Sequence, residues 1–478
     1  MSEMIRFWEE GILFCDGWYI YTNGKGDYSI ISKQAANKKM EDHQRYQVSQ
    51  DTGRAGLSHD IAFSSRGFQK IDGKYVYVGK EIEKLASSPV REISEILTIP
   101  KKVGNYPITY IAKDAFFEEP SIKKLILHDK IKSIEQNAFM DCINLTQIEN
   151  MSEWITIGKD AFKNTQINKN EQLHYLNHVL IKAESTCSGK IVVKDGIHAI
   201  SDNAFENCKD ITEVVLPQSM RKIGACVFQN CTNLEHIQMP DEMDFLGENA
   251  FYGCAKLNNV VIPKGIQFIR QRTFENCENL SNIQIPHGIR RIYYNAFNRT
   301  AFIKQFYESD ETELYLNDWL IRYKYDCKKT LRIRPGTVGV ADMDWSDTKT
   351  LKGIDLPEGL KYIGSDAFRT RDIKTIHLPQ SVLTIGRAAF RHTSISKVII
   401  PASVKKVDAW AFMDCESIER IIIQGEATEI IWPAITDRRD KNLITIIAHT
   451  NSSAHEYCKK YGEQYNLHFV DINKMQKG

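Results

Sequence analysis

Cysteine is the residue type whose number and spacing most invite a chemical role in this 478-residue chain. Six of its eleven cysteines stand three residues after a phenylalanine: Cys142, Cys208, Cys231, Cys254, Cys277 and Cys415. The 23-residue step between neighbours is not zinc-finger spacing, and no Cys-x-x-Cys pair occurs. Side chains repeated at one position of a stack run parallel, which is poor disulfide geometry. The pattern therefore predicts buried, unbridged thiols that pack as small apolar residues and suit a reducing compartment.

Other reactive residue types give weaker signals. His174 and His178 are four residues apart, which suits metal ligands on one helix face, but the segment around them looks extended. Cys15 and His43 are the only nucleophile and base candidates, and a structural role is favoured for both. The chain contains no phosphate-binding glycine loop, nucleophile elbow or H-E-x-x-H string. The sequence thus predicts a protein that is not an enzyme and has no cofactor or metal.

Composition sets the broad class. The chain has 62 Lys and Arg against 61 Asp and Glu, and 42% of its residues are hydrophobic, so a highly basic nucleic-acid binder and a disordered chain are both disfavoured. Charge is uneven, because residues 201–260 hold nine acids and four bases, whereas residues 361–406 hold nine bases and two acids. Such charges usually form a solvated surface, and an anion-binding face is the alternative.

No apolar run reaches the length of a membrane span, and the first ten residues lack the apolar core of a signal peptide. We therefore expect a cytoplasmic protein. The alternative is a cell-surface or extracellular location, reached by unconventional export or explained by a misassigned start.

A repeat dominates the chain. Phenylalanines recur every 23 residues from Phe205 to Phe297 and from Phe116 to Phe162, and every 22 residues from Phe368 to Phe412. In one coil, Val260 and Ile262 share a face of a short strand that Pro263 ends, and Ile266 and Ile269 form a second apolar edge. One coil buries too little apolar surface to fold alone, so the coils must stack into a solenoid.

The stretch from Cys254 to Phe274 fits the frame L-x-x-I-x-L-P-x-x-V-x-x-I-G-x-x-A-F-x-x-C, with Arg270 in place of Gly and Thr273 in place of Ala. Over residues 95–425 the chain resembles the BspA-like leucine-rich repeat family. The resemblance implies an α/β-type repeat solenoid that is curved, with a parallel β-sheet on its concave face. It also implies adhesin-like binding of other macromolecules.

The remaining segments divide the chain. We expect an N-terminal β-rich cap domain at residues 1–90, with Asp-Gly turns at residues 16–17 and 72–73, a solenoid at 91–425 and a C-terminal cap at 426–478. Insertions near 163–190 and 298–330 match each other at an offset of 140 residues, which predicts two inserted hairpins, and Trp345 continues the phenylalanine spine. In the C-terminal cap, a capping box at Ser453–Glu456 predicts a helix that stops at Gly462, before a strand at 467–470.

The outward positions of the strands before each Leu-Pro pair are the predicted ligand-binding residues, since solenoids bind partners on their concave sheet. They are Glu213, His236, Gln238, Asn259, Asn282, Gln284, Asp355, Thr375, His377, Lys397 and Arg420. We therefore expect a monomeric, non-enzymatic protein that binds a protein or another macromolecule, other than nucleic acid, through the concave sheet and hairpins. The alternative is an intracellular sensor or effector whose first 90 residues carry an activity and whose repeats select the target.

Overall fold

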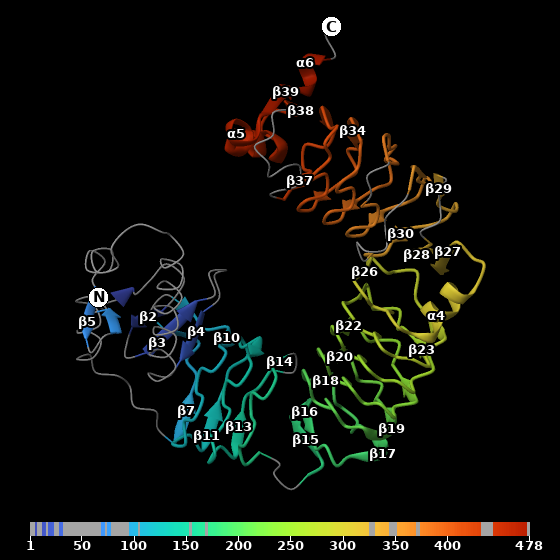
Figure 1. The fold of residues 1–478 in the computed structure, drawn as a ribbon. Helices are drawn as coiled ribbons and strands as arrows, with labels where there is room; N and C mark the ends of the chain where they lie inside the picture. The colour runs from blue at the N-terminus through green and yellow to red at the C-terminus, as the bar shows by residue number, and fades with distance from the viewer. Residues whose placement is uncertain are drawn as a thin grey trace. The chain divides into compact units, whose positions relative to one another are not determined.

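The computed structural model describes residues 95–475 except 104–105, 153–154, 168–170, 325–329, 344–350, 370–372 and 432–442. Before residue 95 it describes the strands β1 (Ile5–Arg6), β2 (Ile12–Cys15), β3 (Trp18–Thr22), β4 (Tyr28–Ile31), β5 (Phe68–Ile71) and β6 (Lys74–Tyr77). The chain forms two compact units, 1–183 and 184–478 (Figure 1). His43, Cys327, Trp345 and the side chain of Cys15 lie outside the described residues.

One strand of each coil ends near the Leu-Pro pair, and these strands form parallel ladders that we call the Leu-Pro sheet. The first unit contains β7 (Ile96–Thr98), β11 (Lys124–Ile126) and β13 (Gln147–Glu149). The second unit contains β17 (Ser188–Val192), β19 (Asp210–Val215), β21 (His236–Gln238), β23 (Asn259–Val261), β25 (Asn282–Gln284), β29 (Thr330–Arg332), β31 (Gly353–Asp355), β34 (Lys397–Ile400), β36 (Arg420–Ile423) and β38 (Ile444–Ala448). Buried and outward residues alternate along them, as in Asn259–Val261.

The second apolar edge of each coil contributes a short strand. These strands form parallel ladders of their own, which together we call the Ile-Gly sheet. The first unit contributes β10 (Tyr110–Ile111), β12 (Ser133–Ile134) and β14 (Thr156–Ile157). The second contributes β18 (Ala199–Ile200), β20 (Lys222–Ile223), β22 (Phe245–Leu246), β24 (Phe268–Ile269), β26 (Arg291–Ile292), β30 (Gly339–Val340), β32 (Tyr362–Ile363), β33 (Thr384–Ile385), β35 (Lys406–Val407) and β37 (Glu429–Ile430). Each strand buries its second or both residues except β37, and the strands of the second unit pair in three consecutive parallel runs, β18 to β22, β24 to β26 and β30 to β37.

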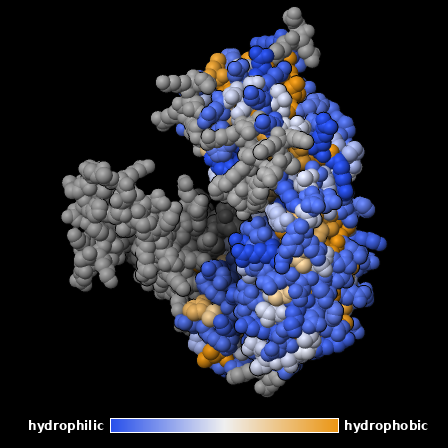
Figure 2. Space-filling view, turned by 45° about the vertical axis from the view of Figure 1, so that its right-hand side comes forward, coloured by the Kyte–Doolittle hydropathy of each residue, from blue (hydrophilic) through white to orange (hydrophobic). Residues whose placement is uncertain are grey.

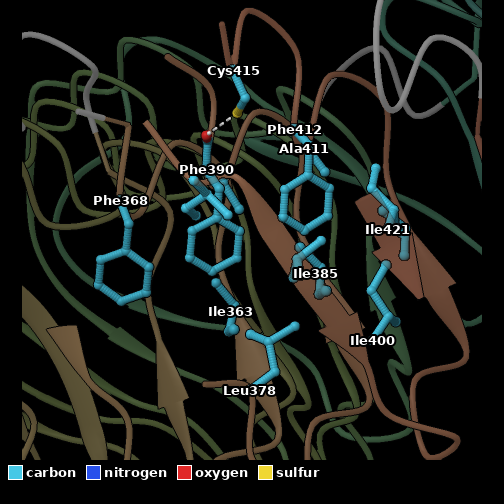
Figure 3. Close-up of a cluster of buried hydrophobic side chains, with 14 of the residues drawn as sticks. Ile363, Phe368, Leu378, Ile385, Phe390, Ile400, Ala411, Phe412, Cys415 and Ile421 are labelled. Atoms are coloured by element: carbon cyan, nitrogen blue, oxygen red, sulfur yellow. Dashed lines mark hydrogen bonds between the residues drawn. The ribbon is translucent and has the colours of Figure 1, made fainter. Parts of the chain in front are cut away.

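Between the sheets lies the core, whose spine is a ladder of stacked phenylalanines. All eleven spine rings are buried, and neighbouring ring centroids lie 5.1–5.8 Å apart. Figure 3 shows three of these rings, Phe368, Phe390 and Phe412, in a row. The backbone joins the same rungs, as where the N–H of Phe228 donates to the carbonyl of Ala250 at 2.8 Å. The spine predicted from the 23-residue step is therefore confirmed at these positions.

Two turn positions in each coil adopt left-handed backbone geometry, two residues before and two residues after the spine phenylalanine. Around Phe205 they are Asn203 (φ 61°) and Asn207 (φ 64°). Asparagine tolerates this geometry better than most residues because its short polar side chain bonds locally. Residues that tolerate it less well stand at the same positions in later coils, including Trp410 (φ 64°) and His392 (φ 63°).

The repeated cysteines bond to the spine. The thiols of Cys142, Cys231, Cys254 and Cys277 each donate to the carbonyl of the spine phenylalanine 26 residues earlier, at 3.1 Å. Cys415 donates to the Phe390 carbonyl at 3.2 Å (Figure 3). These side chains are at most 5% exposed. Their predicted role as small packing residues thus includes at least one hydrogen bond each, and Cys415 also contacts the Thr393 hydroxyl at 3.1 Å.

Burial of these thiols predicts an alkaline loss of stability. It raises the pKa of Cys142 to about 12 and that of Cys415 to about 11, from 9.0. Above pH 9 the unfolded chain releases protons that the folded chain retains, so the free energy of unfolding should fall by about 1.4 kcal/mol per thiol and pH unit until the folded pKa is reached. Urea titrations between pH 8 and 10.5 measure this slope. The Cys142→Ser/Cys415→Ser variant should show a shallower one, and an unchanged slope would contradict the assignment.

The insertions contain antiparallel strand pairs. In the first unit β15 (Leu173–Leu176) pairs with β16 (Val179–Ala183), and in the second β27 (Glu313–Leu316) pairs with β28 (Trp319–Tyr323). The second insertion also contains α4 (Ala301–Glu308), which the sequence analysis did not predict. Thr300 caps α4, and its buried residues are Ile303 and Phe306. Strand β28 continues into the Ile-Gly sheet by parallel pairing with β30.

The ends of the stack carry different elements. Strand β2 pairs antiparallel with β3, and β5 with β6, whereas the Asp-Gly turns predicted between them lie outside the described residues. Strand β4 packs beside β10, where Ser29 accepts the N–H of Ala112 at 2.8 Å. The strands β8 (Lys102–Val103) and β9 (Tyr106–Pro107) form a short hairpin. The domain boundary at residue 90 stays a prediction.

The C-terminal helix α5 (Ser453–Tyr465) differs from its prediction at both ends. Its N-cap is Ser452, because the hydroxyl of Ser453 instead accepts the N–H of Ile430 at 3.2 Å. The helix continues past Gly462 and ends at Asn466, which takes the left-handed geometry. Strand β39 (Leu467–Asp471) then pairs with β38, as predicted, and α6 (Ile472–Met475) follows.

Candidate binding face of the second unit

The residues predicted to bind a ligand lie along the Leu-Pro sheet. Nine occupy outward positions of its strands: Glu213, His236, Gln238, Asn259, Asn282, Gln284, Asp355, Lys397 and Arg420. Thr375 and His377 are exposed in a segment that forms no strand. The structure therefore places the nine on the Leu-Pro strands, in four separate parallel ladders, with paired strands in register across neighbouring coils.

This sheet has few features of a binding site. Lys190 pairs with Glu213 at 3.0 Å and Arg332 pairs with Asp355 at 3.2 Å, so neighbouring coils neutralise two of the predicted residues. Exposed Val192, Val261 and Ile399 stand singly on different strands. Figure 2 shows a largely hydrophilic surface with hydrophobic residues in small separate groups. These features are those of an ordinary solvated surface.

The two sheets lie on opposite sides of the second unit's bend. In Figure 1 the Ile-Gly strands β18, β20 and β22 lie on the inner side, and the Leu-Pro strands β17, β19 and β23 lie on the outer side. The sequence analysis predicts the opposite placement, because the repeat shows which residues share a face but not in which direction the stack bends. The inner face is therefore the Ile-Gly sheet in this unit.

Aromatic and basic side chains gather on this inner face, which we call the basic-aromatic face. It comprises Lys222, Phe245, Phe268, Arg270, Arg290, Arg291, Tyr293, Trp319, Tyr362, Arg387, Lys405, Lys406 and Trp410. The cations stack on the rings: Arg270 lies 4.6 Å from the Phe245 ring centroid, Arg291 4.3 Å from that of Tyr293 and Arg387 3.8 Å from that of Trp410. These contacts hold flat rings and charged groups at one surface.

Two pockets open in the face. The first has a volume of about 420 Å³, and its lining includes Phe268, Arg290, Trp319, Tyr362 and Lys405. The second, of about 390 Å³, lies farther along the same coils toward the spine turn, and its lining is Gln271, Tyr294, Asn295, Asp366, Arg369, Arg387, Ala388, Arg391 and Trp410. Both have the size of ligand pockets. The first combines apolar walls with a few charged groups, whereas the second is lined mainly by charged and polar side chains.

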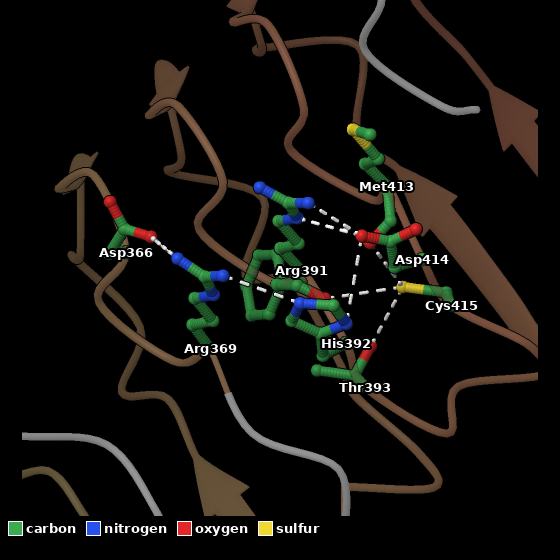
Figure 4. A network of polar contacts seen from close by, with 9 residues as sticks. Asp366, Arg369, Arg391, His392, Thr393, Met413, Asp414 and Cys415 are labelled. Carbon is green, nitrogen blue, oxygen red and sulfur yellow. Dashed lines mark hydrogen bonds and ion pairs between the residues drawn. The ribbon is translucent and has the colours of Figure 1, made fainter. Parts of the chain in front are cut away.

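A polar network supports the second pocket, as Figure 4 shows. Arg369 contacts Asp366 at 3.3 Å and the Nε2 atom of His392 at 3.3 Å. Asp414 accepts two bonds from Arg391, at 2.9 and 2.7 Å, and lies 3.7 Å from the Nδ1 atom of His392. The network thus runs from Asp366 to Arg391 across neighbouring coils and fixes both guanidinium groups.

A buried ion pair supports the first pocket. The guanidinium of Arg291 bonds both carboxylate oxygens of Asp342, at 3.2 and 2.9 Å, and the hydroxyl of Ser365 at 2.7 Å. The Asp342 side chain has no exposed surface, whereas that of Arg291 is 30% exposed. Burial raises the pKa of Asp342 although Arg291 acts against it. The positive charge of Arg291 is therefore largely neutralised by Asp342.

Three cations of the face have no such partner. Arg290, Arg387 and Lys405 are exposed and form no ion pair with any residue that the structure describes. Lys406, by contrast, lies 3.7 Å from Asp408. The face thus offers three exposed cations that have no salt-bridge partner among the described residues, which we call the uncompensated cations, although the charge of Arg387 also acts on Asp366. Their position beside aromatic rings favours an anionic partner.

The position of Trp410 predicts an unusual mutational result. Left-handed geometry costs a residue of this kind about 1–2 kcal/mol, and equivalent positions hold Asn203, Asn249 and Asn295. Relief of this strain should offset the lost contact with Arg387, so Trp410→Asn should keep the free energy of unfolding within about 1 kcal/mol. Trp410→Ala lacks the asparagine's local bonds and should be less stable. Urea unfolding compares the two variants, and equal losses would contradict the strain.

The predicted histidine pair does not form a metal site on a helix. His174 lies on β15 and His178 in the turn after it, so the structure does not place them on one helix. Within the described part of the chain, no group of three or more His, Cys, Asp or Glu side chains could hold a metal ion. No described helix has both the length and the apolar character needed to cross a bilayer.

The sequence analysis missed the basic-aromatic face, although two signals pointed to it. Arg270 and Tyr293 replace the glycine of the Ile-Gly pair. That glycine normally lies against the neighbouring coil, since a Cβ at Gly247 would lie 2.3 Å from the backbone of Gly224. Trp319 in the second insertion corresponds to Val179 in the first. A large residue at a repeat position that usually holds a small one therefore indicates where the surface departs from the repeat.

Comparisons with known proteins agree with the repeat architecture. A family model described as BspA type leucine rich repeat region (6 copies) matches residues 67–179, 189–317 and 342–461. A comparison with curated proteins finds no match.

Solved structures of bacterial leucine-rich repeat proteins also match. The protein from Bacteroides ovatus is 19% identical, with 80% of this chain and 94% of that chain covered and a TM-score of 0.26. A leucine rich cell surface protein from Faecalibacterium prausnitzii is 16% identical, with 89% and 98% covered and a TM-score of 0.23. The leucine rich repeat protein of T. pallidum is 20% identical, with 45% and 82% covered and a TM-score of 0.21.

Proposed function

Because the chain belongs to the BspA-type leucine-rich repeat family, we propose that it is a non-enzymatic binding protein that recognises a macromolecule through the basic-aromatic face. The observation that carries this proposal is the pair of pockets beside three uncompensated cations, Arg290, Arg387 and Lys405. The second inserted hairpin takes part, because its Trp319 lines the first pocket. The nine predicted residues of the Leu-Pro sheet are the competing surface.

Site-specific photo-crosslinking in the full-length protein separates the two surfaces. One probe replaces Phe268, which is 36% exposed on the basic-aromatic face, and the other replaces His236, which is exposed on the Leu-Pro sheet. We expect a partner adduct from position 268 in extracts of the source cells. Adding Arg290→Gln, Arg387→Gln and Lys405→Gln should abolish it. An adduct from position 236 alone, or one that survives the triple change, would contradict the proposal.

The alternative function, an activity in the first 90 residues, needs a test that keeps the stack intact. Deleting these residues would remove Ser29, whose hydroxyl accepts the N–H of Ala112 in the first coils. Loss of binding after the deletion would therefore not identify an activity. A turnover assay with the full-length protein is the better measurement, because turnover would contradict a purely binding role.

We also propose that the protein works in a reducing compartment, the cytoplasm. The support is the column of buried thiols, in which Cys231, Cys254 and Cys277 donate hydrogen bonds and form no disulfide. Fractionation of the source cells with detection of the native protein tests this location. A signal from the cell surface or the medium would replace it with the exported alternative.

A further inference from the structure

We propose that the first pocket of the basic-aromatic face binds an extended acidic polypeptide segment. In this arrangement an apolar side chain of the segment enters the pocket, and carboxylates on either side pair with Lys405 and with Lys361, a further exposed cation two coils away. The inference rests on the proposed function, since it takes this face as the recognition surface. It adds the chemical class of the partner and the spacing of the groups that are recognised.

The pocket offers an apolar floor. Trp319 and Tyr362 stack with ring centroids 6.0 Å apart, and both line the pocket. The Trp319 ring lies over Gly339, where a Cβ atom would be 2.5 Å from two of its ring carbons. In the first module, 140 residues earlier, the equivalent residues are Val179 and Ala199. The tryptophan and the glycine that admits it thus occur together in the second module, where the pocket is.

Trp319 also supplies a donor. Its side chain is 1% exposed, and its buried Nε1–H finds no acceptor among the residues that the structure describes. Leaving such a group unbonded is costly, so a backbone carbonyl or carboxylate of a ligand would gain by accepting it. This orphaned donor is independent of the charge argument.

The spacing of cations and apolar side chains matches an extended chain. Lys361, Leu383 and Lys405 occupy equivalent positions of three successive coils, joined by backbone bonds of 2.8 Å. Coils are about 4.8 Å apart, so the two lysines lie about 10 Å apart across the leucine. An extended peptide rises about 3.3 Å per residue. Every second side chain of such a peptide faces the surface, so acidic residues four positions apart, with an apolar residue midway, span about 13 Å and can meet both flexible lysine side chains.

The same surface is less suited to a dense polyanion. Asp408 lines the first pocket, where it lies 3.7 Å from Lys406. A carboxylate in this position repels closely spaced phosphates or sulfates but can accept the N–H groups of a peptide. A sulfated sugar chain also lacks an apolar side chain to fill the floor. Oligonucleotides and sulfated oligosaccharides are therefore the competing outcomes of the test.

Fluorescence anisotropy with the full-length protein tests the proposal. The probe is a labelled twelve-residue peptide with two aspartates four positions apart and a leucine midway between them, so that all three side chains share one face of the extended peptide. The reference peptide has the same composition with adjacent aspartates. We expect the spaced peptide to bind at least tenfold more tightly, and Lys405→Gln to weaken it about tenfold or more. Lys397→Gln, in the same coil but on the Leu-Pro sheet, is the matched control and should leave the affinity unchanged.

The pocket floor is tested with the residues of the duplicated module. Trp319→Val combined with Gly339→Ala recreates the pair found at Val179 and Ala199, which limits the risk of misfolding, and thermal unfolding checks that the variant folds. We expect this variant to bind the spaced peptide no better than the reference peptide. Retained discrimination would overturn the proposed role of the floor.

The outcomes separate this inference from the proposed function. If the crosslink from position 268 depends on the three cations but neither peptide binds, the acidic-peptide proposal fails and the binding face stands. Tighter binding of a single-stranded oligonucleotide or a heparin-derived oligosaccharide than of the spaced peptide would also overturn it. If the crosslink itself is absent, the proposed function fails as well.

Discussion

Replacing Phe251 with alanine is expected to lower the free energy of unfolding by about 3–5 kcal/mol. The ring is fully buried between Phe228 and Phe274, with centroids 5.3 Å away on both sides. Its loss removes apolar burial from two interfaces at once, because each coil of a solenoid is stabilised by both neighbours. Urea unfolding followed by circular dichroism and by tryptophan fluorescence measures the change.

Phe268→Ala is the matched control for this result. It is a phenylalanine one coil away with 36% of its surface exposed, so its truncation should cost far less. Equal losses for the two variants would mean that the ladder does not carry the stability of the stack. A difference between the two optical signals for Phe251→Ala would show that the two sides of the stack unfold separately.

Replacing Arg291 with leucine is expected to cost about 3–5 kcal/mol, because it leaves the charge of Asp342 buried without its partner. The reverse change should cost less. In Asp342→Asn the amide oxygen can still accept the N–H of Ser365, now bonded at 2.8 Å, and Arg291 can turn toward solvent. The ion pair therefore predicts unequal losses for its two members, and urea unfolding of both variants measures them.

Two further measurements test whether the buried charge of Asp342 causes the stability loss of Arg291→Leu. Arg291→Leu should cost less in an Asp342→Asn background than alone, since no charge is then stranded. Its penalty should also shrink as the pH falls, because burial raises the pKa of Asp342 and the protonated acid carries no charge. The Asp342→Asn background should remove this pH dependence. A penalty that is independent of pH in both backgrounds would refute the explanation.

The periodic parts of the fold were predictable from sequence because each depends on one repeated residue type. The spine follows from the phenylalanine step, and the Leu-Pro strands follow from alternating residues such as Val260 and Ile262. The second sheet was harder to recognise. Its strands are two residues long, so alternation has no room to appear, and Ile266 and Ile269 indicated an apolar edge only. Helix α4 occurs once and carries no periodic signal.

The candidate site was not predictable in the same way. Outward positions such as His236 and Asn259 are exposed in every coil, but exposure alone does not make a pocket. The pockets arise where coils differ from the repeat, at Tyr293 and Trp319, and where cations from distant segments meet. Arg291 and Asp342 are 51 residues apart in sequence, and only the stacking order of the coils brings them together.

The thiol column makes the order in which coils open directly measurable. A cysteine that is sealed in the folded stack becomes reactive only when its own coil opens, so Cys142, Cys254 and Cys415 report on three distant positions without engineered labels. Brief exposure to an alkylating reagent in mild urea, followed by mass spectrometry of the peptides, would rank their protection. The ranking would tell whether the stack opens first at an end or in the middle. The measurement needs only the natural cysteines of the wild-type chain.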